Sequence, residues 1–338
     1  MLKFLFMLCN CVIFLFPTTI FAKGENNVLL EKPYFTIFLE AADIYTYIEF
    51  NRQLISTEKG LPTAVELPVN HLIKAGENEL SLISFANDNK NKKYLDNTHV
   101  KMTLRVRPSG SDPQRNFTLA TLEFSGAKAK AGKGIEGNSP AGRLNSRKDF
   151  IADSNGDIAV SEVSIEDYKK IGDTVSRKIT LPAIGLPRWA FFDSDNITNI
   201  KSDDIDRDID DNLDKQLIGE LLPIYASIWN ALQAKNIEPI LFLFDERNKE
   251  YDAAFYREPG TTAKKLADSL RESATEPDRK LFPITSSNTK SQVYDNDKMA
   301  RLRMNSHDGL IGLNFVGGGS ESYDIILRKK NGRWIITR

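Results

Sequence analysis

Cysteine is nearly missing from this chain of 338 residues, and the two that occur do not contribute to a fold. Cys9 and Cys11 both lie in the first 22 residues, a segment with the order of a cleaved signal peptide. A mature chain that starts near Lys23 therefore has no disulfide and no thiolate ligand for a metal. We expect its stability to come from packing alone, which a chain of this length can supply.

The first 22 residues predict export. Lys3 gives a positive start, residues 4–16 are apolar except for Asn10, and Ala22 is the small residue that precedes a cleavage site. The alternative is a signal anchor, since the segment approaches the ~20 residues that span a bilayer, but Pro17 and Asn10 disfavour it. We expect cleavage near Ala22, a periplasmic or secreted product, and no membrane contact after removal of the signal.

Catalytic and cofactor motifs are lacking as well. The three histidines, His71, His99 and His307, have no metal-ligand spacing. The glycines of residues 132–137 match G-x-G-x-x-G, but Asn-Ser-Pro follows, which does not open the helix that a phosphate site needs. Residues 317–322 lack the closing glycine of a nucleophile elbow. The sequence therefore predicts no cofactor and no metal, and it favours a protein that is not an enzyme.

An excess of charge of one sign is also absent. Lys and Arg number 45 and Asp and Glu 46, so the formal net charge is −1. Loss of the signal removes one further positive charge, Lys3. Nucleic-acid-binding proteins carry basic surfaces, and a nearly neutral chain does not predict one. We expect a protein or a small ligand as the partner.

The densest run of charge is a set of aspartates between residues 193 and 214. Acids at the start of a helix complement its positive end, and a solvated helix face accounts for most such runs. On helical spacing, Asp204, Asp208 and Asp211 share the face opposite Ile205 and Ile209. The alternatives are that these three carboxylates bind a cation or meet a basic partner.

Residues 34–124 alternate in short apolar stretches with turn residues between them, which predicts β-strands. In residues 100–107 the apolar side chains fall on even positions, so one face of that strand should be buried. The stretch LIKAGENEL at 72–80 resembles the LxxGxNxL turn of jelly-roll, galactose-binding-like sandwiches, where the turn is architectural. We predict a sandwich over residues 23–198, with a flexible loop at 126–147; a division near residue 112 stays open.

After residue 203 the apolar period becomes helical. Stripes predict helices over residues 205–232, with Pro223 kinking or restarting the first, over 239–256 and over 261–274. Strands follow to the end, with Asn331-Gly332 as a hairpin turn. The region 199–338 is thus predicted to be α+β, and the chain to be a sandwich followed by an α+β domain.

The last 130 residues or so resemble the NTF2-like superfamily, a cone-shaped α+β fold. ALQAKNIEPIL at 231–241 is similar to the family's ALxAxDxExxL, with Asn236 in place of the aspartate, and Trp334 stands in GRWII, similar to GxWxI. The resemblance implies a pocket between sheet and helices, although core packing is the other fate of its aromatic side chains. The predicted binding residues of the whole chain are Asp204, Asp208, Asp211, Tyr225, Trp229, Tyr251 and Trp334.

The segment LPRWAFFD at 186–193 resembles periplasmic proteins of bacterial toxin–immunity systems. That resemblance implies an immunity-like role, in which a protein partner is bound in the periplasm. The main expectation is therefore an exported, non-catalytic binding protein. Two alternatives stay open: a carbohydrate-binding module that uses Tyr34, Tyr45 or Tyr47, and a small-molecule enzyme that uses the C-terminal pocket.

Overall fold

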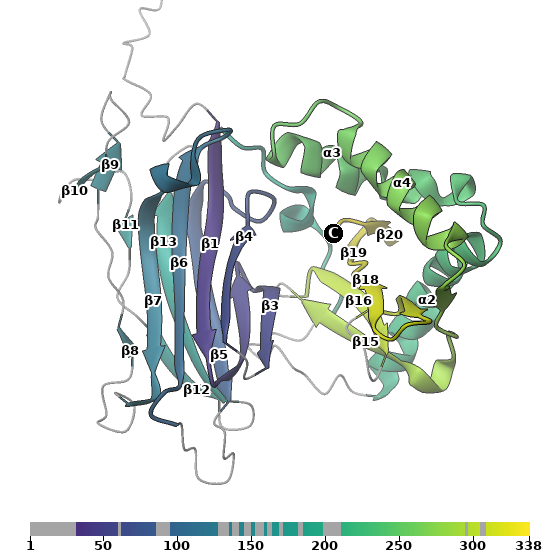
Figure 1. Cartoon of the computed structure of the whole chain (residues 1–338), viewed down its shortest axis with the longest axis horizontal. Helices are drawn as coiled ribbons and strands as arrows, with labels where there is room; N and C mark the ends of the chain where they lie inside the picture. The colour runs from purple at the N-terminus through teal and green to yellow at the C-terminus, as the bar shows by residue number, and fades with distance from the viewer. Residues whose placement is uncertain are drawn as a thin grey trace, which may run out of the picture.

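The computed structural model describes residues 32–59, 62–85, 95–127, 135–136, 142–144, 150–152, 159–160, 164–168, 172–181, 185–198, 211–294, 297–304 and 309–338. The signal segment, most of the loop at 126–147, Asp204, Asp208 and His307 lie outside them. Two lobes are visible, a β-sheet lobe and a lobe of helices and smaller sheets (Figure 1).

The N-terminal lobe consists of two antiparallel sheets arranged like a sandwich. Its strands are β1 (Pro33–Ala42), β2 (Tyr45–Phe50), β3 (Gln53–Lys59), β4 (Thr63–Pro68), β5 (Gly76–Phe85), β6 (His99–Pro108), β7 (Phe117–Ser125), β8 (Ile135–Glu136), β11 (Ala159–Val160), β12 (Ser164–Tyr168) and β13 (Gly172–Leu181). One sheet has the order β4-β1-β6-β7-β8 and the other β11-β13-β5-β2-β3, with β12 paired to β13. Strands β9 (Gly142–Leu144) and β10 (Phe150–Ala152) pair with each other.

Period-two burial builds the core between the sheets. On β6 the even positions, Val100, Met102, Leu104 and Val106, are fully buried, as the alternation predicts. They meet buried side chains from β1 and from the opposite sheet in one continuous cluster. The odd positions face outward, where Arg105 lies over the ring of Phe38, 4.1 Å from its centroid.

The turn that leads into β5 is held by a glycine and an asparagine. Gly76 has φ +84°, a conformation that side chains with a Cβ rarely adopt. Asn78 is buried, and its side chain accepts a hydrogen bond from the Lys74 backbone N–H and donates one to the Lys74 carbonyl. The asparagine therefore satisfies backbone groups that the turn leaves without sheet partners.

The C-terminal lobe is a mixed α/β region with three α-helices and antiparallel sheets. Its elements are α2 (Asp211–Gln233), the 3-10 turns of η3 (Glu238–Phe244), α3 (Asp245–Ala254), α4 (Thr261–Thr275), β14 (Arg279–Leu281), β15 (Thr289–Tyr294), β16 (Met299–Met304), β17 (Ile311–Phe315), β18 (Ser320–Tyr323), β19 (Leu327–Lys330) and β20 (Arg333–Ile336). The sheets have the orders β14-β17-β18 and β15-β16-β19-β20. The helices pack against them over a second apolar core (Figure 1).

Two helices differ in detail from the expected ones. Pro223 lies inside α2, which continues through it. Leu221 and Tyr225, on either side of the proline, are fully buried, and their packing outweighs one missing backbone hydrogen bond. The segment expected as one helix over 239–256 is η3 followed by α3.

The hairpin at Asn331-Gly332 is confirmed, since both residues have the positive φ that such a turn requires.

A segment between the lobes, residues 185–198, is anchored to both, and we call it the linker. It contains η2 (Ala190–Asp193). Trp189 is buried, and its Nε1 donates to the carbonyl of Ile73 in the sandwich at 2.9 Å. The next backbone N–H, that of Ala190, donates to Glu250 Oε1 of α3 at 2.6 Å. The sandwich, the linker and α3 are thus held by consecutive linker residues.

Arg338 contributes to the same contact between the lobes, which we call the seam. Figure 1 marks the C-terminus between the lobes. The guanidinium of Arg338 donates to Glu250 Oε2 and to the carbonyl of His71, each at 2.6 Å, and lies over the ring of Phe191. The side chains of Arg338 and Glu250 are 4% and 13% exposed. This pair is therefore largely removed from water. The loss of one partner would leave the charge of the other buried and uncompensated.

We expect Arg338→Ala to lower the free energy of unfolding by about 3 kcal/mol, because a buried ion pair that loses one partner leaves an uncompensated charge. Urea denaturation of the full chain measures this. The matched control is Arg271→Ala, whose ion pair with Glu238 is exposed. Its loss should lower stability far less than the loss of Arg338. Equal losses in the two variants would contradict the role of the seam.

Candidate functional site

The residues that the sequence predicts for binding do not gather around one cavity. Tyr225 is fully buried; its hydroxyl donates to the Ile325 carbonyl and accepts from the Leu302 N–H. Burial raises the pKa of Tyr225 far above its ordinary value. Trp229 is half-buried, and its Nε1 donates to the carbonyl of Phe282 at 2.7 Å. Both side chains serve the core of the C-terminal lobe.

Trp334 is bound to α2. Its Nε1 donates to Glu220 Oε2 at 2.7 Å, and Lys329 pairs with the same carboxylate while its ammonium lies over the indole. Burial tends to raise the pKa of Glu220, but hydrogen bonds from Lys329, Gln216 and Trp334 outweigh it, and the net pKa is lowered. The indole is therefore fully used in fastening β20 to the helix.

Of the three aspartates on one predicted helix face, the structure describes Asp211. It is exposed in the first turn of α2, where a negative charge complements the helix dipole. Its neighbour Asp214 has a structural role, since its carboxylate accepts hydrogen bonds from both the backbone N–H and the hydroxyl of Ser291 on β15.

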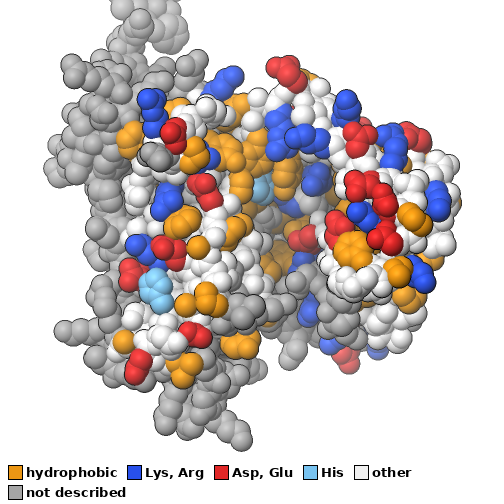
Figure 2. Space-filling view, viewed as in Figure 1, with side chains coloured by type: hydrophobic (Ala, Val, Ile, Leu, Met, Phe, Trp, Pro, Cys, Tyr) orange, Lys and Arg blue, Asp and Glu red, His pale blue; other side chains and the backbone are white. Residues whose placement is uncertain are grey.

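Tyr251 is different, because it lies where the two lobes meet. Its ring is 4.7 Å from the ring of His71 and 5.8 Å from that of Phe255, and Phe255 is 6.0 Å from Tyr34 of β1. These rings, all half-buried, line what we call the inter-lobe cleft. Figure 2 shows a hollow between the lobes, with hydrophobic side chains on its walls and Lys and Arg side chains on its helical side.

Arginine side chains cover these rings. The guanidinium carbons of Arg247, Arg257 and Arg107 lie 4.6 Å, 5.2 Å and 4.7 Å from the ring centroids of Tyr251, Phe255 and Tyr34, respectively. Such cation–π contacts are strongest where water is excluded. The cleft therefore combines aromatic area with concentrated positive charge.

Two of these arginines have no acidic partner. Arg107 pairs with Glu66 at 2.8 Å, whereas Arg247 and Arg257 form no ion pair with any carboxylate that the structure describes. Burial lowers the pKa of Arg247, and the nearby charges of Arg338 and Arg257 lower it further, against a smaller opposing effect of Tyr251. A guanidinium in this environment would be stabilised by an anion.

The neighbouring acids are already occupied. On α3, Glu246 pairs with Arg328 and Glu250 with Arg338. Asp252 is buried and accepts hydrogen bonds from the backbone N–H groups of Gly260 and Thr262 and from the Thr262 hydroxyl. These bonds fix the loop between α3 and α4 that carries Arg257. The carboxylates thus position the arginines without neutralising them.

His71 completes the cleft from the sandwich side. Its Nδ1 is buried and has no hydrogen-bond partner in the described part of the chain. Burial lowers the pKa of His71 well below its ordinary value, and the positive charges of Arg338 and Arg247 lower it further. The imidazole is therefore neutral at pH 7, and the positive charge of the cleft comes from arginine.

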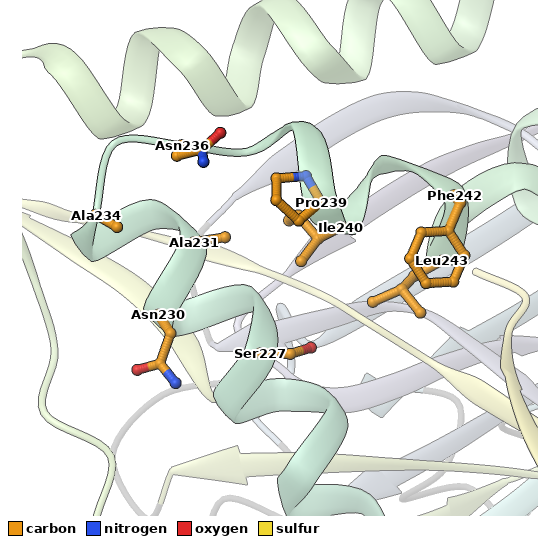
Figure 3. A pocket seen from close by; sticks show the side chains of 9 residues that line it. All are labelled: Ser227, Asn230, Ala231, Ala234, Asn236, Pro239, Ile240, Phe242 and Leu243. Atoms are coloured by element: carbon orange, nitrogen blue, oxygen red, sulfur yellow. The ribbon is translucent and has the colours of Figure 1, made fainter.

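A second hollow, of about 390 Å³, lies between the end of α2 and η3. Figure 3 shows Ser227, Asn230, Ala231 and Ala234 of the helix on one side and Phe242 and Leu243 on the other. Phe242 is 67% exposed. The lining consists of apolar side chains with a few hydroxyl and amide groups, and none of the residues that line it titrates near neutral pH.

Within the described ranges, no group of three His, Cys, Asp or Glu side chains is placed to hold a metal ion. None of the helices that the structure describes combines the length and apolarity needed to span a bilayer.

Among the residues of the inter-lobe cleft, the sequence predicts Tyr251 as a binding residue but does not predict His71, Arg247 or Arg257. One signal was present: Arg247 stands in the otherwise apolar stripe that leads to Tyr251 and Phe255. A charge within an apolar stripe indicates either a buried pair or a site. Comparisons of the chain with protein-family models, with known proteins and with solved structures find no match.

We expect Tyr225→Phe to lower the free energy of unfolding by about 1–3 kcal/mol, because two backbone groups in the core lose their partner. Equilibrium urea denaturation tests this. Tyr45→Phe removes a hydroxyl from a residue that is 52% exposed and should change stability by less than about 0.5 kcal/mol. A neutral Tyr225→Phe would show that the hydroxyl does not support the core.

The lowered pKa of His71 predicts a pH dependence. Below about pH 6.5, His71 is protonated in the unfolded chain but stays neutral in the folded chain. Its contribution to the free energy of unfolding is therefore present above that pH and is lost as the pH falls. We expect the loss to approach ~1.4 kcal/mol per pH unit. Plotted against pH between 5.5 and 7.5, the free energy of unfolding from urea denaturation should give a flatter curve for His71→Gln than for wild type. Parallel curves for wild type and His71→Gln would refute it.

Proposed function

We propose that this protein is an exported, non-catalytic binding protein that holds a protein partner in the inter-lobe cleft. The observation that carries the proposal is the pair Arg247 and Arg257, which lie over aromatic rings and have no acidic partner among the described residues. Tyrosine and arginine dominate the binding energy of protein interfaces. The export signal of the sequence supports the compartment.

The chemistry of the cleft selects the partner's side chains. A guanidinium binds a carboxylate through two parallel hydrogen bonds, and these are strongest where water is excluded. The rings of Tyr251, Phe255 and Tyr34 offer apolar area beside the two guanidiniums. The best-fitting ligand is therefore a segment that carries Asp or Glu next to apolar residues.

The other two functions find less support. Sugar rings stack on uncovered aromatic faces, whereas guanidiniums lie over Tyr34, Tyr251 and Phe255; Tyr45 and Tyr47 lie on β2, in the other sheet from Tyr34. Acid–base catalysis needs two convergent titratable groups. The hollow beside Phe242 has none in its lining, and in the cleft the neutral His71 faces arginines.

We further propose that the sandwich is of the jelly-roll type and that the C-terminal lobe is NTF2-like, divided near residue 198. The helix-then-sheet order of that lobe and the Asn331-Gly332 hairpin support this. With the resemblance at residues 186–193, an immunity-like role is the form of binding that we propose. The aspartates at 204, 208 and 211 stay a second proposed contact, toward basic side chains.

We expect peptides selected by phage display on the wild-type protein to carry acidic residues next to apolar ones. Their affinity should fall at least tenfold, about 1.4 kcal/mol, for Arg247→Gln/Arg257→Gln, because the variant keeps polarity but loses the positive charge. Fluorescence anisotropy measures this, and affinity should also fall as salt rises.

The matched control is Arg271→Gln, which removes an exposed arginine of α4. It should bind every selected peptide as the wild type does, and all variants should unfold at nearly the same urea concentration as the wild type. Selected peptides without acidic residues, bound equally by the double variant, would refute the proposal.

A further inference from the structure

We propose that a second site, separate from the inter-lobe cleft, binds a small phosphate monoester such as a sugar phosphate. It is a polar groove of about 280 Å³, and we call it the basic groove. Its lining comes from three parts of the chain: the sandwich, the linker and the C-terminal lobe. The residues are Asn51, Arg52, Lys74, Glu77, Asn78, Glu79, Lys178, Arg188, Phe192 and Lys298.

The groove carries an excess of positive charge in a chain that is nearly neutral overall. Five of its ten lining side chains are Lys or Arg, and two are Glu. Cations held together in a concave surface repel one another and raise the local concentration of anions. The fold therefore assembles a positive potential here that the composition does not reveal.

Two of the cations are available to a ligand. Lys178 pairs with Glu77 at 2.9 Å, Arg188 with Asp193 at 2.9 Å and Arg52 with Glu79 at 3.5 Å. By contrast, Lys74 and Lys298 form no ion pair within the part of the chain that the structure describes. The ammonium of Lys298 donates to the Ser194 carbonyl at 2.6 Å, which holds it at the groove.

The floor of the groove is held by hydrogen bonds of two asparagine side chains. Asn51 donates to the side chain of Asn78 at 2.9 Å and accepts from the backbone N–H of Glu79 at 2.8 Å. Both asparagines are buried. Asn78 also exchanges two hydrogen bonds with the backbone of Lys74, so the turn fixes the position from which the Lys74 side chain extends.

The aromatic wall distinguishes this groove from a simple patch of charge. Lys74 Nζ lies 4.9 Å and the Arg188 guanidinium 5.5 Å from the centroid of the Phe192 ring. The ring thus places two cations beside one apolar surface. A ligand with a compact dianion and a carbon skeleton matches both features, since ammonium groups bind phosphate as point charges. The volume is that of a small-molecule site rather than of a polymer track.

Isothermal titration of the full mature protein at constant ionic strength tests this with three probes: inorganic phosphate, glucose 6-phosphate and citrate. We expect saturable one-site binding of phosphate, tighter binding of glucose 6-phosphate, and citrate weaker than both. Lys74→Gln/Lys298→Gln should weaken phosphate binding at least tenfold. Lys74→Arg/Lys298→Arg keeps the charge and should bind within about threefold of wild type.

The matched control is Lys249→Gln/Lys264→Gln, which removes two exposed lysines from α3 and α4 and should bind phosphate as wild type does. Heat that does not saturate, or equal loss in the two Gln double variants, would overturn the site. Tight citrate binding with no phosphate signal would overturn the assignment to a phosphate group. Since these variants leave Arg247 and Arg257 intact, the outcome is independent of peptide binding in the cleft.

Discussion

The ion pair between Glu250 and Arg338 is the interaction on which the arrangement of the molecule depends. Glu250 accepts from Arg338 and from the linker N–H of Ala190, while Arg338 also donates to the carbonyl of His71. Four segments that are far apart in sequence therefore meet at one carboxylate and one guanidinium. Since both side chains are largely removed from water, each depends on the other for compensation. The relative position of the lobes follows from this local requirement.

The same requirement explains the charge of the inter-lobe cleft. Helix α3 carries twice as many acidic as basic side chains. However, Glu246 pairs with Arg328 of β19, Glu250 pairs with Arg338, and Asp252 bonds the loop after the helix. What remains toward the cleft is Arg247. A neutral sequence thus produces a positive surface, because the fold decides which charges compensate each other.

The basic groove also forms where the linker meets both lobes. Arg188 and Phe192 of the linker stand between lysines of the sandwich and Lys298 of the C-terminal lobe. Neither lobe alone contains the full set of cations. In both proposed sites, contacts of the linker and the seam bring the charged side chains together, while the sheets provide rigid supports. Both proposed binding sites therefore lie where the lobes meet, whereas the interiors of the lobes are packed apolar cores.

The sequence by itself determined the local features of this protein. Alternation at residues 100–107 places a buried face on β6, the Asn331-Gly332 pair sets a hairpin, and the stripe through Tyr251 sets the inward face of α3, because each is governed by contacts within a few residues. Only the tertiary structure decided the sites. Tyr225 and Trp334 looked like binding residues until their polar atoms were seen to be engaged by backbone and Glu220. Likewise, His71 reaches the cleft only because Arg338, 267 positions away, fixes the seam. Period and propensity carry no information on which charges pair across such separations, so the excess charge of the cleft and the groove emerges only when the lobes meet.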